Sequence, residues 1–154
     1  MKILIVEDDL NKLQHLEQCL SAKYSDAEII RARSYQSGLK ATLSLAPSFI
    51  VLDMTLPTYD VSTTEGGGRP RPFAGREILS EMARKVGHGK VIVVTQFETF
   101  GEGTQKKTLA ELDAELGRAF PELYIGAVYY HPAQSDWKTS LLKLAEVAGG
   151  EIGQ

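Results

Sequence analysis

Three carboxylates stand directly behind short apolar runs that lie far apart in the chain. Glu7 and Asp8 follow the apolar residues 3–6, and Asp53 follows the apolar residues 49–52. If both runs are buried strands of one parallel sheet, their carboxyl ends share the edge at which open α/β sheets bind ligands. Carboxylates held that close repel one another, and Mg²⁺ relieves the repulsion because it binds one or two carboxylates and keeps several waters. The spacing therefore predicts a Mg²⁺ site around Asp53.

A purely structural role is the alternative for these acids. Glu7 and Asp9 would then cap the following helix, because a carboxylate at a helix N-terminus accepts hydrogen bonds from free amides. Capping does not account for Asp53, which is followed by an irregular stretch with Pro57 rather than by a helix. The metal site explains Glu7, Asp8 and Asp53 together and is the interpretation that we favour. Asp9 is a plausible N-cap of the following helix in either case.

The pattern of apolar residues predicts five strands that alternate with five helices. In the first helix, Leu10, Leu13, Leu16 and Leu20 recur at helical spacing and predict the buried face, which places Lys12 on another face. Alternation of this kind predicts an α/β fold in which helices cover both faces of a parallel sheet. The expected strands are residues 2–6, 27–32, 49–52, 90–95 and 124–130.

Composition places the chain among soluble globular proteins of one domain. Its 154 residues are 43% hydrophobic and 24% charged, and a formal net charge of −3 argues against a general nucleic-acid or membrane binder. Cys19 is the single cysteine, which excludes a disulfide framework. No apolar run reaches the ~20 residues of a membrane span, and the N-terminal run is too short for a signal peptide. We therefore expect a cytoplasmic protein.

Three segments, in this order, resemble the receiver domain of two-component response regulators. They are Ile3-Leu4-Ile5-Val6-Glu7-Asp8-Asp9, Val51-Leu52-Asp53-Met54-Thr55-Leu56-Pro57 and Val93-Val94-Thr95. The resemblance covers residues 1–154, which would form a stand-alone, single receiver domain. It implies a flavodoxin-like, doubly wound sheet of five parallel strands in the order 2-1-3-4-5, with helices on both faces.

The resemblance also implies a role for each site residue. Asp53 would be the phosphoacceptor, taking a phosphoryl group from a histidine kinase or a phosphotransfer protein. Asp8, Asp53 and the backbone carbonyl of Thr55 would bind Mg²⁺, with Glu7 acting through a water. Thr95 would be the hydroxyl that moves toward the phosphoryl group on activation.

A protein of this kind is a signalling phosphoprotein rather than an enzyme, with at most slow self-dephosphorylation. Its output would run through contact with an unknown downstream protein or through onward transfer in a phosphorelay. Neither nucleic acid nor a membrane is expected as a partner, and the sequence leaves open whether the chain forms a homodimer.

Two residues expected beside the phosphoryl group depart from the family's pattern. His131 precedes Pro132 where the family has a lysine, and Gln96 stands where a small residue is usual after the switch threonine. An imidazole with a pKa of about 6.5 is mostly neutral at pH 7. His131 therefore either replaces the lysine in a weaker, pH-dependent contact or makes no contact with the phosphate. Gln96 is expected to contact the phosphoryl group and to narrow the access to Asp53.

A third departure concerns the aromatic side chain that switches rotamer in the family. Val128 occupies the expected position of this aromatic residue, and either Tyr129 or Tyr130 would have to substitute for it.

Two segments, around residues 54–72 and 96–108, are longer than in plain receivers. The first contains prolines, a triple glycine, Arg69 and Arg71, a composition that fits either a solvated loop or a docking segment over the phosphorylation edge. In the second, Thr104 is expected to cap the helix that follows.

Two other functions compete with the phosphorylated receiver. A degenerate pseudo-receiver would act as a phosphorylation-independent interaction module; the missing lysine favours it, and the intact acids oppose it. A Mg²⁺-dependent phosphohydrolase or nucleotide enzyme on the same scaffold is the other. The sequence lacks a glycine-rich phosphate loop with the required spacing, which argues against an enzyme of this kind.

Overall fold

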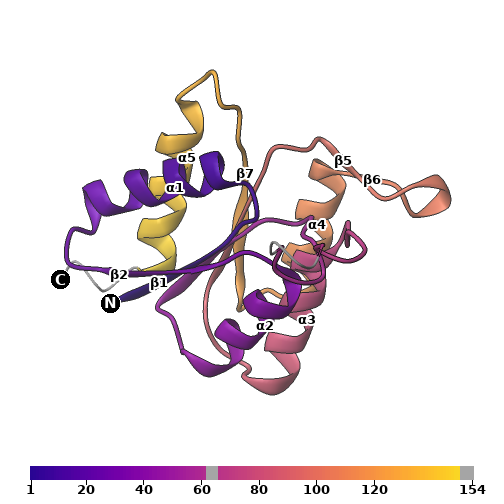
Figure 1. Ribbon diagram of the computed structural model, residues 1–154, viewed down its shortest axis with the longest axis horizontal. Helices are drawn as coiled ribbons and strands as arrows, with labels where there is room; N and C mark the ends of the chain where they lie inside the picture. The colour runs from indigo at the N-terminus through magenta and orange to yellow at the C-terminus, as the bar shows by residue number, and fades with distance from the viewer. Residues whose placement is uncertain (62–65, 150–154) are drawn as a thin grey trace.

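A five-stranded parallel sheet forms the centre of the protein, as a computed structural model shows (Figure 1). The structure describes residues 1–61 and 66–149. The strand order is β2-β1-β3-β4-β7, so β7 is the fifth strand of the predicted order and the flavodoxin-like prediction is confirmed. The strands are β1 (Lys2–Val6), β2 (Glu28–Ala32), β3 (Phe49–Leu52), β4 (Val91–Thr95) and β7 (Tyr124–Tyr129).

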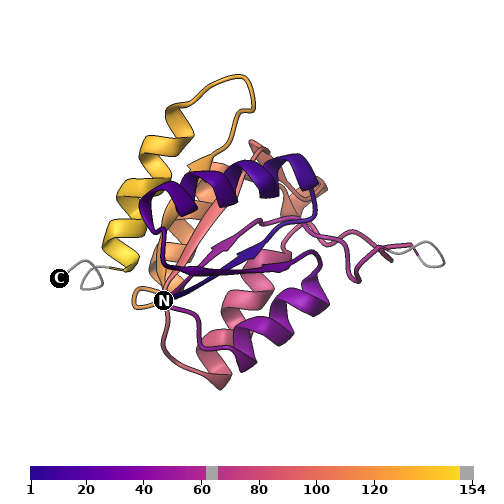
Figure 2. The same ribbon diagram turned by 60° about the vertical axis from the view of Figure 1, so that its left-hand side comes forward.

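Helices cover both faces of this sheet (Figure 2). One face carries α1 (Leu10–Lys23) and α5 (Asp136–Ala148), whose buried side chains share an apolar cluster. The other face carries α2 (Tyr35–Ser44), α3 (Ala74–Lys85) and α4 (Leu109–Ala119), which pack in a second cluster. Among the described residues, no helix is long and apolar enough to cross a membrane.

The apolar runs of the central strands fill both clusters because successive side chains of a strand point to opposite faces. In β1, Leu4 and Val6 belong to the cluster under α2, α3 and α4, whereas Ile3 and Ile5 belong to the cluster under α1 and α5. Burial on both faces explains why the runs are continuous rather than alternating. The first polar side chain after each run therefore lies at the carboxyl edge of the sheet.

The segment between β4 and α4 differs from its prediction. It contains an antiparallel pair, β5 (Thr99–Phe100) and β6 (Lys107–Thr108), which projects from the body of the molecule around the 3₁₀ turn Gly103–Gln105 (Figure 1). Thr108, not Thr104, caps α4: its side chain accepts from the amide of Glu111, and the Glu111 side chain accepts from the amide of Thr108. The prediction for Thr104 was wrong because residues 103–105 turn the hairpin and lie before the helix.

The segment between β3 and α3 is tied back to the edge of the sheet. The backbones of Leu56 and Arg71 form an isolated antiparallel bridge, with mutual hydrogen bonds of 3.2 and 2.8 Å. Pro70 is thereby held beside the carboxyl end of β3. Residues 62–65 of this segment lie outside the described residues.

Candidate functional site

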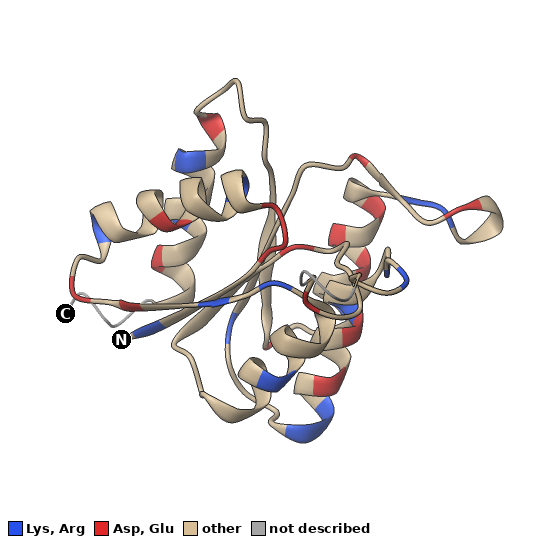
Figure 3. Cartoon of the chain, in the orientation of Figure 1, with Lys and Arg blue, Asp and Glu red and all other residues tan. Residues whose placement is uncertain are grey.

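Three acids meet at the carboxyl edge because β1 and β3 are neighbours in register. Val6 pairs with Leu52, so Glu7 and Asp53 leave the sheet side by side, and Figure 3 shows acidic segments following both strands at this edge. Glu7, Asp8 and Asp53 each offer a carboxylate oxygen within 4.8 Å of the others. Glu7 and Asp53 are buried, whereas Asp8 is exposed.

Backbone amides hold one oxygen of each buried acid. The amide of Met54 donates to Asp53 Oδ1 at 2.8 Å, and the amide of Asp9 donates to Glu7 Oε2 at 3.0 Å. Asp9 itself caps α1, as expected, by accepting from the amide of Lys12 at 3.1 Å. The first turn of α1 and the ends of β1 and β3 therefore form one rigid edge.

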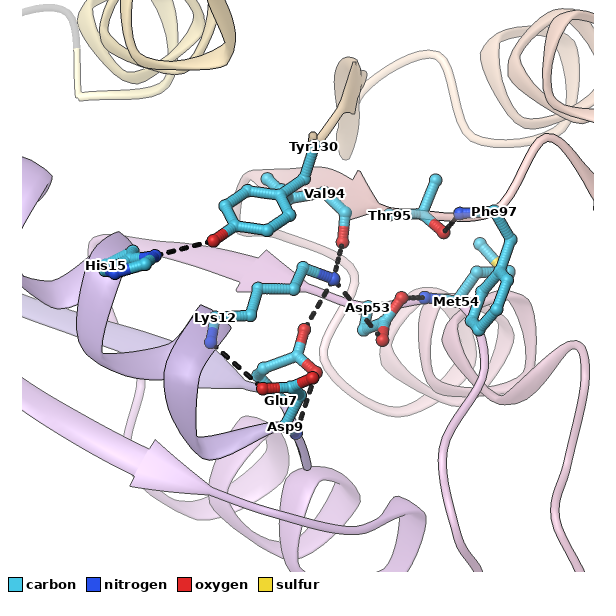
Figure 4. A network of polar contacts seen from close by, with 10 residues as sticks. All are labelled: Glu7, Asp9, Lys12, His15, Asp53, Met54, Val94, Thr95, Phe97 and Tyr130. Atoms are coloured by element: carbon cyan, nitrogen blue, oxygen red, sulfur yellow. Dashed lines mark hydrogen bonds and ion pairs between the residues drawn. The ribbon is translucent and has the colours of Figure 1, made fainter. Parts of the chain in front are cut away.

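Lys12 points into this group of acids, which sequence analysis did not predict. Its Nζ lies 2.6 Å from Glu7 Oε1 and 3.4 Å from Asp53 Oδ2, and it donates to the carbonyl oxygen of Val94 at 2.8 Å (Figure 4). The Lys12 side chain is 1% exposed. The prediction that placed Lys12 away from the interior was therefore wrong.

The buried face of α1 agrees with the predicted one at Leu13, Leu16 and Leu20 and differs from it only in the first turn. Lys12, Leu16 and Leu20 are four residues apart and all buried, whereas Leu10 is 60% exposed. A stripe with steps of four along Lys12, Leu16 and Leu20 was visible in the sequence, and it was the signal that could have found Lys12. Apolar residue type outweighed spacing in the prediction, which is why Leu10 was chosen instead.

Burial shapes the electrostatics of the site. Removal from water, and then the negative charge of Asp53, raises the pKa of Glu7 to about 8, although Lys12 opposes the rise. Burial also raises the pKa of Asp53, against the opposing effects of Lys12 and the Met54 amide. Glu7 and Asp53 are therefore unfavourable to ionise at the same time unless a further cation binds beside them.

A hollow of about 220 Å³ opens beside Asp53 and makes it accessible from one side. Its lining residues come from the ends of the strands and from the segment between β3 and α3, and include Asp8, Asp53, Thr55, Pro70 and Gln96. The donor set fits a hard divalent cation, which prefers oxygen ligands. Three ionised carboxylates and the Lys12 ammonium would leave two net negative charges for such a cation to neutralise.

Two residues expected near the phosphoryl group make contacts within their own turns. Thr95 is buried, and its Oγ1 accepts from the amide of Phe97 at 3.1 Å. His131 Nδ1 accepts from the amide of Ala133 at 3.2 Å. His131 is not among the residues that line the hollow, whereas Gln96 is.

Sequence comparison places this site among known proteins. No family model matches the sequence. The chain is 40% identical over 142 residues to the uncharacterized protein y4jR of Sinorhizobium fredii, covering 92% of this chain and 94% of the relative. It is 34% identical over 145 residues to the Detocs response regulatory protein DtcB of Enterobacter cloacae, covering 93% and 97%. The chain belongs to the response regulators.

Solved structures agree on the fold of this response regulator. The CheY-like receiver domain from Methanospirillum hungatei has a TM-score of 0.61 at 19% identity, covering 99% of this chain and 96% of that one. The response regulator TrrA from Thermotoga maritima, in complex with Mg²⁺-BeF, has a TM-score of 0.57 at 19% identity, covering 93% and 97%. The sheet and helices of this chain are those of a receiver domain.

One tyrosine of this receiver domain reaches the interior next to Lys12. Tyr130 is buried, its ring centroid lies 5.8 Å from Lys12 Nζ, and its hydroxyl is hydrogen-bonded to His15 Nδ1 at 2.7 Å (Figure 4). Tyr129 is 41% exposed, and Val128 is buried in the core. Of the two tyrosines named as substitutes for a switching aromatic residue, Tyr130 is the one beside the acids.

Proposed function

We propose that residues 1–154 act as one receiver domain that accepts a phosphoryl group on Asp53 from a histidine kinase or a phosphotransfer protein, with Mg²⁺ bound. The observation that carries this proposal is the meeting of Glu7, Asp8 and Asp53, of which Asp8 and Asp53 line a hollow at the carboxyl edge. Asp8, Asp53 and the Thr55 carbonyl would bind the metal directly, and Glu7 would act through a water. TrrA, which shares the fold, was solved in complex with Mg²⁺-BeF, and this supports the proposal that Mg²⁺ takes part.

The chemistry is an in-line transfer between two nucleophiles. A carboxylate oxygen of Asp53 forms a bond to phosphorus while the bond between phosphorus and the donor imidazole nitrogen breaks, and that nitrogen keeps the electron pair. When bound, Mg²⁺ neutralises charge on the transferring group. The amide of Met54 and the ammonium of Lys12 hold the Asp53 carboxylate in one orientation, so little reorganisation precedes the attack.

The response to phosphorylation would start at the end of β4. Thr95 Oγ1 now holds the amide of Phe97. Movement of this hydroxyl toward a phosphoryl oxygen would release that amide and with it the turn that leads into β5. Gln96 is the next residue in the chain and lines the hollow, so it would move together with Thr95.

A contact between His131 and the phosphoryl group is a separate hypothesis. The imidazole would have to give up its hydrogen bond with the amide of Ala133, or present its other nitrogen, to reach the hollow. The replacement His131→Ala tests the hypothesis, because a real contact would shorten or lengthen the life of the phosphorylated state.

We further propose that the protein signals by protein contact in the cytoplasm. Its response-regulator relatives and receiver fold support a signalling role rather than that of a classical enzyme. The pseudo-receiver alternative is less well supported because the acids remain assembled around an accessible Asp53. Interaction experiments would identify the downstream partner and test for a homodimer.

Incubation with acetyl phosphate, with and without Mg²⁺, tests the proposal. We expect the intact mass to rise by one phosphoryl group, in an adduct that survives acid better than alkali, as an acyl phosphate does. Asp53→Asn should abolish the adduct, whereas Asp26→Asn, which changes an exposed aspartate, should leave it unchanged. Failure of the wild type to form an adduct with acetyl phosphate and with a panel of histidine kinases, or persistence of the adduct in Asp53→Asn, would overturn the proposal.

A further inference from the structure

The site contains the ammonium group of Lys12, at a position in the chain for which the resemblance to receiver domains predicted no cation. The lysine expected before Pro132 is replaced by His131, whose imidazole is hydrogen-bonded within its own turn. Among the described residues, Lys12 is the one cation within ion-pair distance of Glu7 or Asp53. Arg33, the other cation nearby, donates to the backbone oxygen of Asp8 and not to a carboxylate.

The ammonium of Lys12 makes three polar contacts, one hydrogen bond and two ion pairs. Its acceptors are Glu7 Oε1, Asp53 Oδ2 and the carbonyl oxygen of Val94, which lie at the ends of β1, β3 and β4. Burying an ammonium costs free energy unless it is paired and hydrogen-bonded in this way. Three neighbouring strands therefore fix the position of Nζ.

The contact with Asp53 is the longest of the three. At 3.4 Å it is 0.8 Å longer than the contact with Glu7, so Nζ is held mainly by Glu7 and Val94 and lies beside the acceptor carboxylate. A group attached to Asp53 would add negatively charged oxygens next to this ammonium. Charge-assisted hydrogen bonds to phosphoryl oxygens are among the strongest that proteins make.

We propose that Lys12 is the phosphoryl-contacting cation of this receiver, supplied by the first turn of α1 instead of the end of the last strand. The inference rests on the proposed phosphorylation of Asp53. As the phosphoryl group bonds to Asp53, one of its oxygens replaces Asp53 Oδ2 as a partner of Nζ. Lys12 keeps its proton and its contacts with Glu7 and Val94 throughout.

A counter-ion that only neutralises the buried acids would make a different prediction. Such a lysine would affect folding and the affinity for Mg²⁺, but not the affinity for a phosphoryl group once Mg²⁺ is bound. The discriminating quantity is therefore the affinity for beryllofluoride, a phosphoryl mimic, at saturating Mg²⁺. Isothermal titration calorimetry measures it separately from the affinity for Mg²⁺ alone.

The test compares Lys12→Met, which removes the charge at similar length, with a matched control at an exposed lysine and with a variant of the rival candidate His131. Lys143→Met removes an exposed charge from α5, and His131→Ala removes the imidazole before Pro132. We expect Lys12→Met to weaken beryllofluoride binding by about tenfold to a hundredfold, with Mg²⁺ binding unchanged or tighter because a competing cation is gone. Lys143→Met should change the beryllofluoride Kd by less than about twofold, within the usual range of surface substitutions, and His131→Ala should weaken binding less than Lys12→Met does.

Two results would overturn the role of Lys12. One is a beryllofluoride Kd within about twofold of the wild type in folded Lys12→Met, and the other is a greater loss in His131→Ala than in Lys12→Met. If Lys12→Met does not fold, the ¹⁵N resonance of the Lys12 ammonium in the wild type decides whether Lys12 contacts beryllofluoride. It should shift when beryllofluoride is added at constant Mg²⁺, and an unmoved resonance rejects the contact.

Failure of this inference is distinguishable from failure of the proposed function. A wild type that binds no beryllofluoride and forms no adduct refutes phosphorylation itself. A wild type that binds beryllofluoride, with Lys12→Met binding it equally well, refutes only the role of Lys12.

Discussion

The two sides of the carboxyl edge are built in different ways. At the ends of β1 and β3, contacts join residues far apart in the chain: Lys12 reaches Glu7, Asp53 and the backbone of Val94. At the ends of β4 and β7, the side-chain hydrogen bonds of Thr95 and His131 reach residues only two positions further along. The acceptor side, at the ends of β1 and β3, is thus held by contacts across the sheet, whereas two side chains expected to respond, those of Thr95 and His131, are hydrogen-bonded within their own turns. A local turn can rearrange at lower cost than a buried cluster can.

Removal of Mg²⁺ should have the largest effect, because it acts on the acceptor side directly. Excess EDTA should lower the rate of phosphoryl uptake from acetyl phosphate by at least about a hundredfold, since charge neutralisation by a metal contributes several kcal/mol. Intact-mass spectrometry over time measures the rate, and Mg²⁺ added in excess over EDTA should restore it. An undiminished rate in EDTA would show that the acids do not work through a metal.

Lys12→Met should reveal how strongly the acceptor side depends on long-range contacts. Without Mg²⁺ at pH 7, we expect the free energy of unfolding to fall by about 3 kcal/mol, because Glu7, Asp53 and the carbonyl of Val94 lose the buried group that pairs with them. Urea unfolding measures the loss, and Lys143→Met is the matched control with an expected change within about 0.5 kcal/mol. Saturating Mg²⁺ should reduce the loss, because the metal replaces the ammonium as counter-ion. A loss that Mg²⁺ does not reduce would contradict this account.

The buried Glu7 predicts a pH dependence of the metal-free protein. Its pKa is about 8 in the folded state and near 4.5 when exposed, so the folded state binds the proton more tightly. Stability from this group is full below pH 4.5 and is lost as the pH rises toward 8. The melting temperature without Mg²⁺ should therefore fall across this window, and Glu7→Gln should flatten the fall. Equal slopes for the two proteins would exclude Glu7 as the cause.

Thr95→Val should have the smallest effect, and this effect should be confined to the end of β4. Loss of the acceptor for the Phe97 amide removes one hydrogen bond, for which we expect about 1 kcal/mol of lost stability. Mg²⁺ affinity should be unchanged, and Thr95→Ser should retain the hydrogen bond with the Phe97 amide because it keeps the hydroxyl, although it loses one buried methyl group. A marked loss of Mg²⁺ affinity in Thr95→Val would mean that the two sides are coupled before phosphorylation.

The sequence by itself determined the sheet, its order through the family resemblance, and the acids at its edge. These features depend on local signals: continuous apolar runs make strands buried on both faces, and the first carboxylate after a run lies where the strand ends. Thr108 shows the limit of such signals. The sequence analysis expected Thr104 to cap this helix, and the hairpin between β4 and α4 places Thr108 at that position instead.

Tertiary structure alone decided which side chains accompany the acids. Helical periodicity tells which residues of α1 share a face, but the first turn of α1 lies over the edge of the sheet, where an inward position meets carboxylates instead of apolar side chains. A lysine is stable there and a leucine gains nothing, so Lys12 is buried and Leu10 is exposed. Likewise, Tyr129 and Tyr130 are alike in sequence, and the end of β7 turns only Tyr130 toward Lys12. The acids were predictable from the chain, and their counter-ion was not, because its partners come from three different strands.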